Sequence, residues 1–222
     1  MSQQDNEIEN LKELVVTMAS HAENSVHQAL KALLRRDDDL ARVTREEDTR
    51  IDLLEVDIDS AVHEYLASKP LPWPVLRRAT TAMKIAHDLE RVGDEATTIA
   101  RRAILLGQDS QLEQVESIPP MAQIALDQLK ESIDCFVAGE PERARALIPR
   151  DKELDRLNKQ LVAQLIDHMS LHPKTVSRIL HLMVISKSLE RIGDHATNIA
   201  EMVVYMCEGR DIRHSSKSTP RA

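Results

Sequence analysis

A twelve-residue segment of the chain occurs twice, one hundred residues apart. Residues 89–100 read LERVGDEATTIA and residues 189–200 read LERIGDHATNIA, so nine of the twelve positions are identical. A repeat at long period predicts two units of the same architecture. In both copies a glutamate precedes an aspartate by four residues. On a helix this spacing places two carboxylates side by side, where they repel each other unless a cation lies between them. The repeat therefore bears on both the fold and the chemistry.

Composition indicates a soluble, helical, intracellular protein. Of the 222 residues, 42% are hydrophobic, 2% are aromatic and 5 are glycine, which argues against a large sheet. The net charge of −8 argues against nucleic-acid binding, which requires a basic face. No apolar run approaches the roughly 20 residues of a membrane span, and the polar N-terminus is unlike a secretory signal. Cys135 and Cys207 lie in apolar sequence, and we expect two buried thiols rather than a disulfide or a metal pair.

Apolar residues recur every three or four positions along nearly the whole chain, which is typical of amphipathic helices. Acidic residues, prolines and glycines mark the breaks, and Gly107 is expected to form a left-handed C-cap. Short connections predict antiparallel neighbours. We therefore expect an all-α fold, a tandem repeat of two antiparallel three-helix bundles. The expected helices are 5–36, 39–68, 73–106, 119–138, 141–170 and 173–208. The expected units are a first repeat (1–107), a linker (108–118), a second repeat (119–210) and a disordered tail (211–222).

The repeated segment has separate core and acidic faces on a helical wheel. Glu90 and Asp94 lie away from the apolar stripe, and Gly93 lies between them and the core. A glycine inside a helix costs about 1 kcal/mol relative to alanine. Because both copies retain it, we expect a neighbouring helix to approach closely there. The predicted core stripes are Ile85, Leu89, Val92, Ala96, Ile99 and Ala103, and Ile185, Leu189, Ile192, Ala196, Ile199 and Val203.

The preceding helix of the first half carries four acids on one narrow strip. If this strip packs beside the repeated segment, six carboxylates converge, and such a cluster either holds protons or binds cations. Oxygen ligands select hard metals such as magnesium, calcium, manganese or iron. The second half has only two acids in register, so a second site would be weaker. The candidate metal ligands are Asp48, Asp52, Glu55, Asp59, Glu90 and Asp94 in the first half, and Asp151, Asp155, Glu190 and Asp194 in the second.

Other interpretations of these acids stay open. Arg91, Arg101 and Arg191 could neutralise the carboxylates in surface ion pairs. His87 and His195 could join as ligands, although each is more readily explained as a surface residue. The chain contains no phosphate loop, nucleophile elbow or His-Glu-x-x-His motif, so binding is favoured over catalysis. A carboxylate-bridged di-iron oxidoreductase or iron-binding protein is an alternative, but its usual Glu-x-x-His pairs are absent. A purely structural helical scaffold is the third possibility.

The repeated motif and its setting resemble the PhoU family of phosphate-transport regulatory proteins. The resemblance rests on the doubled Leu-Glu-Arg-(Val/Ile)-Gly-Asp-x-Ala motif, the acidic residues of the preceding helices, and the ending VVYMCEGRDIRH at 203–214. It covers about residues 7–214. One departure is the proline-rich sequence LPWPVLR at 71–77.

This resemblance implies a non-enzymatic negative regulator of the phosphate-starvation response. It implies a cytoplasmic homodimer, peripheral to the inner membrane face through its partners, that links the ATPase subunit of a phosphate ABC transporter to a sensor histidine kinase. It also implies metal ions bound by carboxylates (magnesium, manganese, iron or zinc). The implied sites are Asp48/Asp52 with Glu90/Asp94, and Asp151/Asp155 with Glu190/Asp194.

Overall fold

The computed structural model describes residues 3–68, 70–110 and 112–213, and every regular element within these ranges is helical. None of the described helices combines the length and the apolarity that crossing a membrane requires. In chain order the elements are α1 (Gln3–Arg35), α2 (Asp38–Ser68), α3 (Trp73–Gly107), η1 (Glu113–Ser117), α4 (Ile118–Ala138), α5 (Pro141–Leu147), η2 (Ile148–Arg150), α6 (Asp151–Leu171), η3 (Pro173–Thr175) and α7 (Val176–Glu208).

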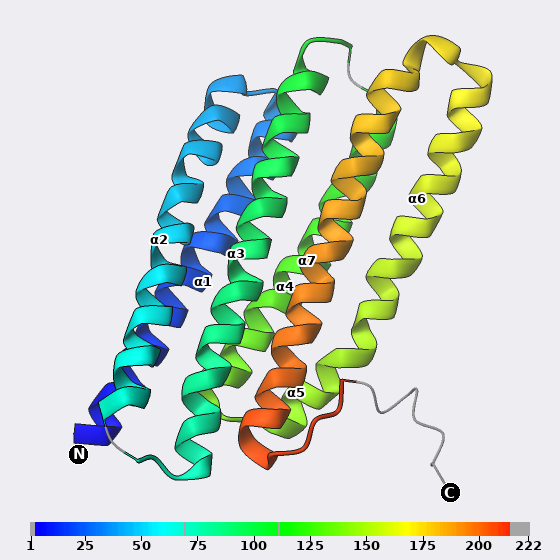
Figure 1. Ribbon diagram of the computed structural model, residues 1–222. Helices are drawn as coiled ribbons and strands as arrows, with labels where there is room; N and C mark the ends of the chain where they lie inside the picture. Colours follow the sequence, from blue (N-terminus) through cyan, green and yellow to red (C-terminus); the bar gives the residue numbers. More distant parts are fainter. Residues whose placement is uncertain (1–2, 69, 111, 214–222) are drawn as a thin grey trace, which may run out of the picture.

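The long helices form two bundles that lie side by side (Figure 1). In the first bundle α1, α2 and α3 all contact one another, and in the second α7 contacts α4, α5 and α6. The helices that carry the repeated segment, α3 and α7, pack against each other at the centre of the molecule. This arrangement confirms the predicted all-helical fold of two repeats. It also places the two copies of the motif on either side of one interface.

The helix expected at 141–170 is divided into α5, η2 and α6. The division falls at Pro149, which lies inside the 3-10 turn. Proline cannot donate a backbone hydrogen bond and clashes with the preceding turn, so a continuous helix is disfavoured here. The prediction overlooked this residue. Because α6 begins at Asp151, that candidate ligand stands at the first residue of its helix.

Most predicted helix ends are found, with one exception. Asp37 caps α2, since its Oδ1 accepts a hydrogen bond from Leu40 N at 2.9 Å. Gly139 follows α4 in the left-handed conformation with φ 68°. The expected left-handed cap at Gly107 is wrong, because this residue is the last of α3 and its φ is not positive. Arg36 has φ 57° instead, and its Nη2 donates to Gly107 O at 2.7 Å.

The core matches the predicted stripes, since all twelve stripe residues on α3 and α7 are buried. The two bundles nevertheless differ in packing. Seven residues of α2 are buried but only three of α6, and α6 contacts its neighbours less extensively than α2 does. Cys135 is buried, whereas Cys207 is exposed, so the expectation of two buried thiols is wrong for Cys207. Most of the tail expected to be disordered, residues 214–222, lies outside the described residues.

Candidate metal centre

The glycine of the first motif permits α2 to approach α3 closely. A Cβ atom added at Gly93 would lie 2.9 Å from Asp48 Oδ1 and 2.9 Å from Ile51 Cδ1. Real Cβ atoms essentially never have such short contacts. The close approach predicted from the two glycines is therefore present, and it brings the acidic strip of α2 beside the motif.

The carboxylates of this first cluster are partly buried and repel one another. Burial is the main cause that raises the pKa of Asp48, and the charges of Asp52 and Asp94 raise it further. Burial also raises the pKa of Glu90, and the charge of Asp94 adds to the effect. The negative charges are thus held where a cation would relieve their repulsion.

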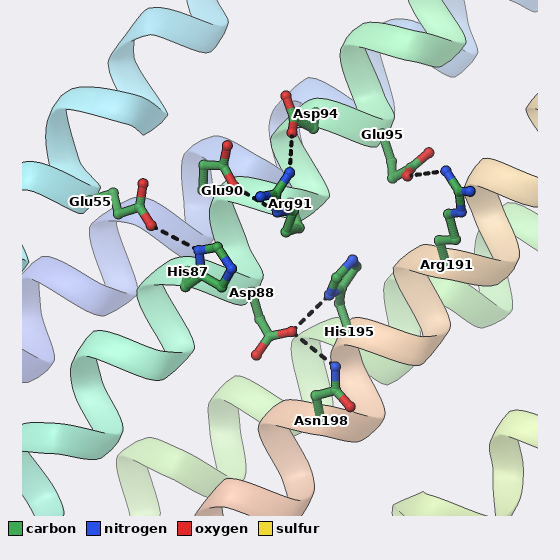
Figure 2. A network of polar contacts seen from close by, with 10 residues as sticks. All are labelled: Glu55, His87, Asp88, Glu90, Arg91, Asp94, Glu95, Arg191, His195 and Asn198. Carbon is green, nitrogen blue, oxygen red and sulfur yellow. Dashed lines mark hydrogen bonds and ion pairs between the residues drawn. The ribbon is translucent and has the colours of Figure 1, made fainter.

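Two side chains of α3 already contact these acids (Figure 2). Arg91 bridges both acids of the motif, with Nε 3.3 Å from Glu90 Oε2 and Nη1 3.2 Å from Asp94 Oδ2. His87 Nδ1 lies 3.2 Å from Glu55 Oε1. One ligand atom each from Glu55, His87 and Glu90 lies within 4.8 Å of the others, a spacing that could hold a metal ion. The ion pairs considered for Arg91 therefore form with the candidate ligands themselves, whereas Arg191 pairs with Glu95 and not with Glu190 or Asp194.

The remaining acid of the strip, Asp59, lies in a different setting from Asp48. It lines a groove of about 690 Å³ between the two repeats, together with Glu55, His87 and Arg91. The strip therefore runs from the close contact at Gly93 to the rim of this groove.

The second cluster lies between α6 and α7. Burial, followed by the charges of Asp194, Asp155 and Glu190, raises the pKa of Asp151 to about 6. Lys187 contacts Glu190 on the same helix, and Lys159 Nζ lies 3.7 Å from Asp155 Oδ2. In the second motif the acid Glu190 is therefore paired with Lys187, one turn before it. In the first motif Arg91 lies between the two acids.

Sequence reasoning missed Gln128 of α4, which is completely buried at this second cluster. A Cβ added at Gly193 would lie 3.2 Å from Gln128 Oε1, 3.3 Å from Asp151 Oδ1 and 2.7 Å from Leu154 Cδ2. Neither polar atom of Gln128, nor Asp151 Oδ1, has a hydrogen-bond partner among the described residues. Buried polar atoms are normally paired, so these oxygens could serve as ligands of a cation. A polar residue on the apolar face of helix 119–138 was the available signal.

The interface between α3 and α7 contains a second polar network that the sequence did not predict (Figure 2). The buried Asp88 Oδ1 lies 2.7 Å from His195 Nδ1 and accepts a hydrogen bond from Asn198 Nδ2 at 3.1 Å. Nearby, Arg191 Nη1 lies 3.0 Å from Glu95 Oε1. His195 is therefore an interface residue, and neither a free surface residue nor a ligand of the second cluster in this arrangement.

Comparison with known proteins places the chain in a family. The model of the PhoU domain matches residues 15–103 and again residues 118–203. The chain belongs to the PhoU family. It is 36% identical over 219 residues to the phosphate-specific transport system accessory protein PhoU homolog of Pseudomonas aeruginosa, covering 96% of this chain and 89% of that protein. The corresponding Pseudomonas putida homolog is 35% identical over 216 residues, with 96% and 84% covered.

Solved structures of PhoU proteins have the same fold. The crystal structure of PhoU from Pseudomonas aeruginosa matches with a TM-score of 0.90 at 33% identity, over 94% of this chain and all of that one. The PhoU structure from Streptococcus pneumoniae matches with a TM-score of 0.88 at 24% identity, which supports the fold alone. The two matched PhoU domains are the two bundles described above.

The donor atoms of both PhoU repeats fit hard metal ions. Carboxylate oxygens dominate both clusters, and such sites suit magnesium, manganese or iron. The group of Glu55, His87 and Glu90 adds one imidazole, which zinc or iron also accepts. Asp151 Oδ1 is buried and has no hydrogen-bond partner in the described part of the chain, which is an observation independent of the motif.

Proposed function

We propose that this protein is a metal-binding adaptor that negatively regulates phosphate uptake and the phosphate-starvation response, and not an enzyme. Its relatives are named as accessory proteins of phosphate-specific transport. The observation that carries the metal proposal is the pair of carboxylate clusters, in which burial and like charges raise the pKa of Asp48, Glu90 and Asp151. A bound cation would remove the repulsion in each cluster and fix the helix that supplies the acids.

Metal binding to the first cluster would replace the guanidinium of Arg91. This side chain bridges Glu90 and Asp94, so the arginine and a metal ion would compete for the same oxygens. Arg91 also lines the grooves between the two repeats. When displaced it would turn toward α7, and metal occupancy would then alter the charge of the surface shared by both repeats.

Family membership supports the proposed partners, because the relatives are named as accessory proteins of phosphate-specific transport. We propose a homodimer on the cytoplasmic side of the membrane that contacts the ATPase subunit of a phosphate ABC transporter and a sensor histidine kinase. In this proposal the metal-filled clusters stabilise one relative arrangement of α2 and α6 on the central helices. That arrangement would be the form that the partners recognise.

Elemental analysis tests the metal sites directly. Protein purified without chelators should contain metal, and Glu90→Gln/Asp94→Asn and Glu190→Gln/Asp194→Asn should each lose the metal of its own cluster. A matched control is Glu9→Gln/Glu13→Gln, which changes an exposed acidic pair with the same spacing on α1. Unchanged metal content in both motif variants would refute the site assignment.

Two further measurements separate this proposal from its alternatives. Bound iron together with oxygen consumption would favour a di-iron oxidoreductase. Retention of partner binding by a metal-free protein would favour a structural scaffold. Co-purification with membrane proteins from phosphate-replete cells, followed by identification of the captured ATPase or kinase, tests the partners.

A further inference from the structure

A cavity of about 340 Å³ lies at the end of the molecule where α3 begins and α7 ends (Figure 1). The two repeats build it together. Ile8 and Leu11 of α1 and Ala82 of α3 come from the first, and Phe136 of α4 comes from the second. Its size is near the lower end of the range of about 300–1,000 Å³ for small-molecule pockets. The cavity is separate from both carboxylate clusters, since none of their acids lines it.

The polar groups of this cavity are basic. Lys12, Arg77 and Arg78 line it, and no acidic residue does so among the described residues. This is notable in a chain whose net charge is −8. Arg77 Nε donates to Met206 O at 3.4 Å, which holds the guanidinium against the end of α7. Lys12 Nζ lies 3.2 Å from Glu9, and Arg78 has no ion pair within the described part of the chain.

The two arginines directly follow the proline-rich corner before α3. Pro72 stands before α3, and its carbonyl accepts hydrogen bonds from Val75 N at 2.9 Å and Leu76 N at 3.0 Å. This turn fixes the start of the helix, and the next two residues are Arg77 and Arg78. The proline-rich corner thus positions the positive charge at the cavity mouth.

We propose that this cavity binds a small amphipathic anion, with an apolar chain of medium length and a carboxylate or phosphate-monoester head. The apolar wall would take the chain, because burial of apolar surface is favourable at about 25 cal/mol per Å². Arg78 and Lys12 would bind the head by charge-assisted hydrogen bonds. The volume accommodates one such chain and excludes a whole two-chain phospholipid. Since α1, α3, α4 and α7 all contribute to the wall, the ligand would bridge the two repeats.

Cys207 provides a reporter for this site. Its thiol is exposed and lines the cavity, whereas Cys135 is completely buried. A neutral thiol reagent such as N-ethylmaleimide should therefore modify Cys207 first, and a ligand in the cavity should slow that reaction. Intact mass spectrometry follows the modification, with decanoate, decyl phosphate, decanol and inorganic phosphate added below any micelle-forming concentration.

We expect decanoate, decyl phosphate or both to slow modification at least fivefold at saturation, and the more protective of the two identifies the head group. Decanol at the same concentration, and inorganic phosphate alone, should leave the rate unchanged. Equal protection by decanol would show a merely apolar cavity and overturn the proposal. Protection by inorganic phosphate alone, or by neither anion, would also overturn it.

A second measurement does not depend on the thiol. By calorimetry, Cys207→Ser should bind the protective anion as the parent does, and Arg78→Gln should bind it about tenfold more weakly through loss of a charged hydrogen bond. Arg42→Gln is the control, because Arg42 is an exposed arginine on α2 far from the cavity lining. Equal affinities of the Arg78 and Arg42 variants would refute the assignment of the head group. None of these outcomes affects the metal proposal.

Discussion

Removing the charge of Asp151 should stabilise the metal-free protein at neutral pH. Its carboxylate is half-buried beside Asp194, Asp155 and Glu190, and these surroundings raise its pKa to about 6 from an ordinary value of 3.8. Above that pKa the folded protein must hold a charge that burial and its neighbours disfavour. Asp151→Asn keeps the shape of the side chain and removes the charge, so the variant should unfold less readily.

The magnitude follows from the pKa. At 1.36 kcal/mol per pKa unit, the difference between 3.8 and about 6 corresponds to about 3 kcal/mol. Because the side chain is only half-buried, solvent screening reduces this to about 1.5 kcal/mol. Asp151 also stands in the first turn of α6, where a negative charge is favourable, and its loss offsets about 0.5 kcal/mol. We expect a net stabilisation of about 1 kcal/mol, or about 2–4 °C in Tm for a chain of this size.

The sign of the pH dependence is opposite to that of a salt-bridged aspartate. The folded state binds the proton more tightly than the unfolded state, so the favourable contribution is complete below pH 3.8 and is lost as the pH rises through about 6. The advantage of Asp151→Asn should therefore be full above pH 7 and should vanish near pH 4. A variant that acts only through packing would show the same difference at both pH values.

Urea denaturation followed by circular dichroism, in the presence of a chelator, measures the effect. Asp57→Asn is the matched control, since Asp57 is an exposed aspartate on α2. Addition of the native metal should reverse the order, because a bound ligand stabilises the parent by RT ln(1 + [L]/Kd) and the variant lacks one ligand. A destabilised Asp151→Asn protein at pH 7.5 without metal, or a gain that persists at pH 4, would refute the electrostatic reasoning.

Three further substitutions test the packing and the cations of the clusters. Gly193→Ala should lower the free energy of unfolding by about 1 kcal/mol, because the added Cβ would lie 2.7 Å from Leu154 Cδ2 and this overlap, costing about 1–3 kcal/mol, outweighs the gain of about 1 kcal/mol in helix propensity; a higher value by urea denaturation would show that Leu154 moves away at little cost. Gln128→Met should raise that free energy by about 1 kcal/mol without metal, since both amide atoms are buried and lack a partner among the residues that the structure describes, and a decrease would reveal a partner for them. Arg91→Gln should bind metal at the first cluster severalfold more tightly in calorimetric titrations, because the competing guanidinium is gone. An unchanged affinity would show that Arg91 does not compete.

Much of the fold could be predicted because the relevant signals are local and repeated. The spacing of apolar residues on α3 and α7 identified their buried faces, and the mid-helix Gly93 predicted the approach of α2. Helix breaks were predicted correctly where several prolines, glycines or acidic residues occur together. The single Pro149 was overlooked because the apolar period continues across it, although one proline is sufficient to interrupt the helix.

The site was less predictable, because its contacts join residues that are distant in the sequence. A helical wheel shows which acids share a face, but it does not show that Gln128 of α4 reaches the second cluster or that Asp88 meets His195 across the interface. The exposure of Cys207 depends in the same way on how the helix ends pack. The ion pairs of Arg91 were foreseen only as an alternative to metal binding. The structure makes them a competitor for the same oxygen atoms.

The number of acids does not by itself determine which cluster holds a cation more strongly. The first cluster has more carboxylates, but the guanidinium of Arg91 already lies between the two acids of its motif. The second has fewer, yet Lys187 reaches only Glu190, and Asp151 retains a buried oxygen without a hydrogen-bond partner among the described residues. A metal ion at the first cluster must displace an arginine at any pH, whereas at the second it competes with a proton only near and below the pKa of Asp151, about 6. Metal binding should therefore depend more steeply on pH at the second cluster than at the first. The two repeats differ in what competes with the metal, which is an arginine in the first and a proton in the second.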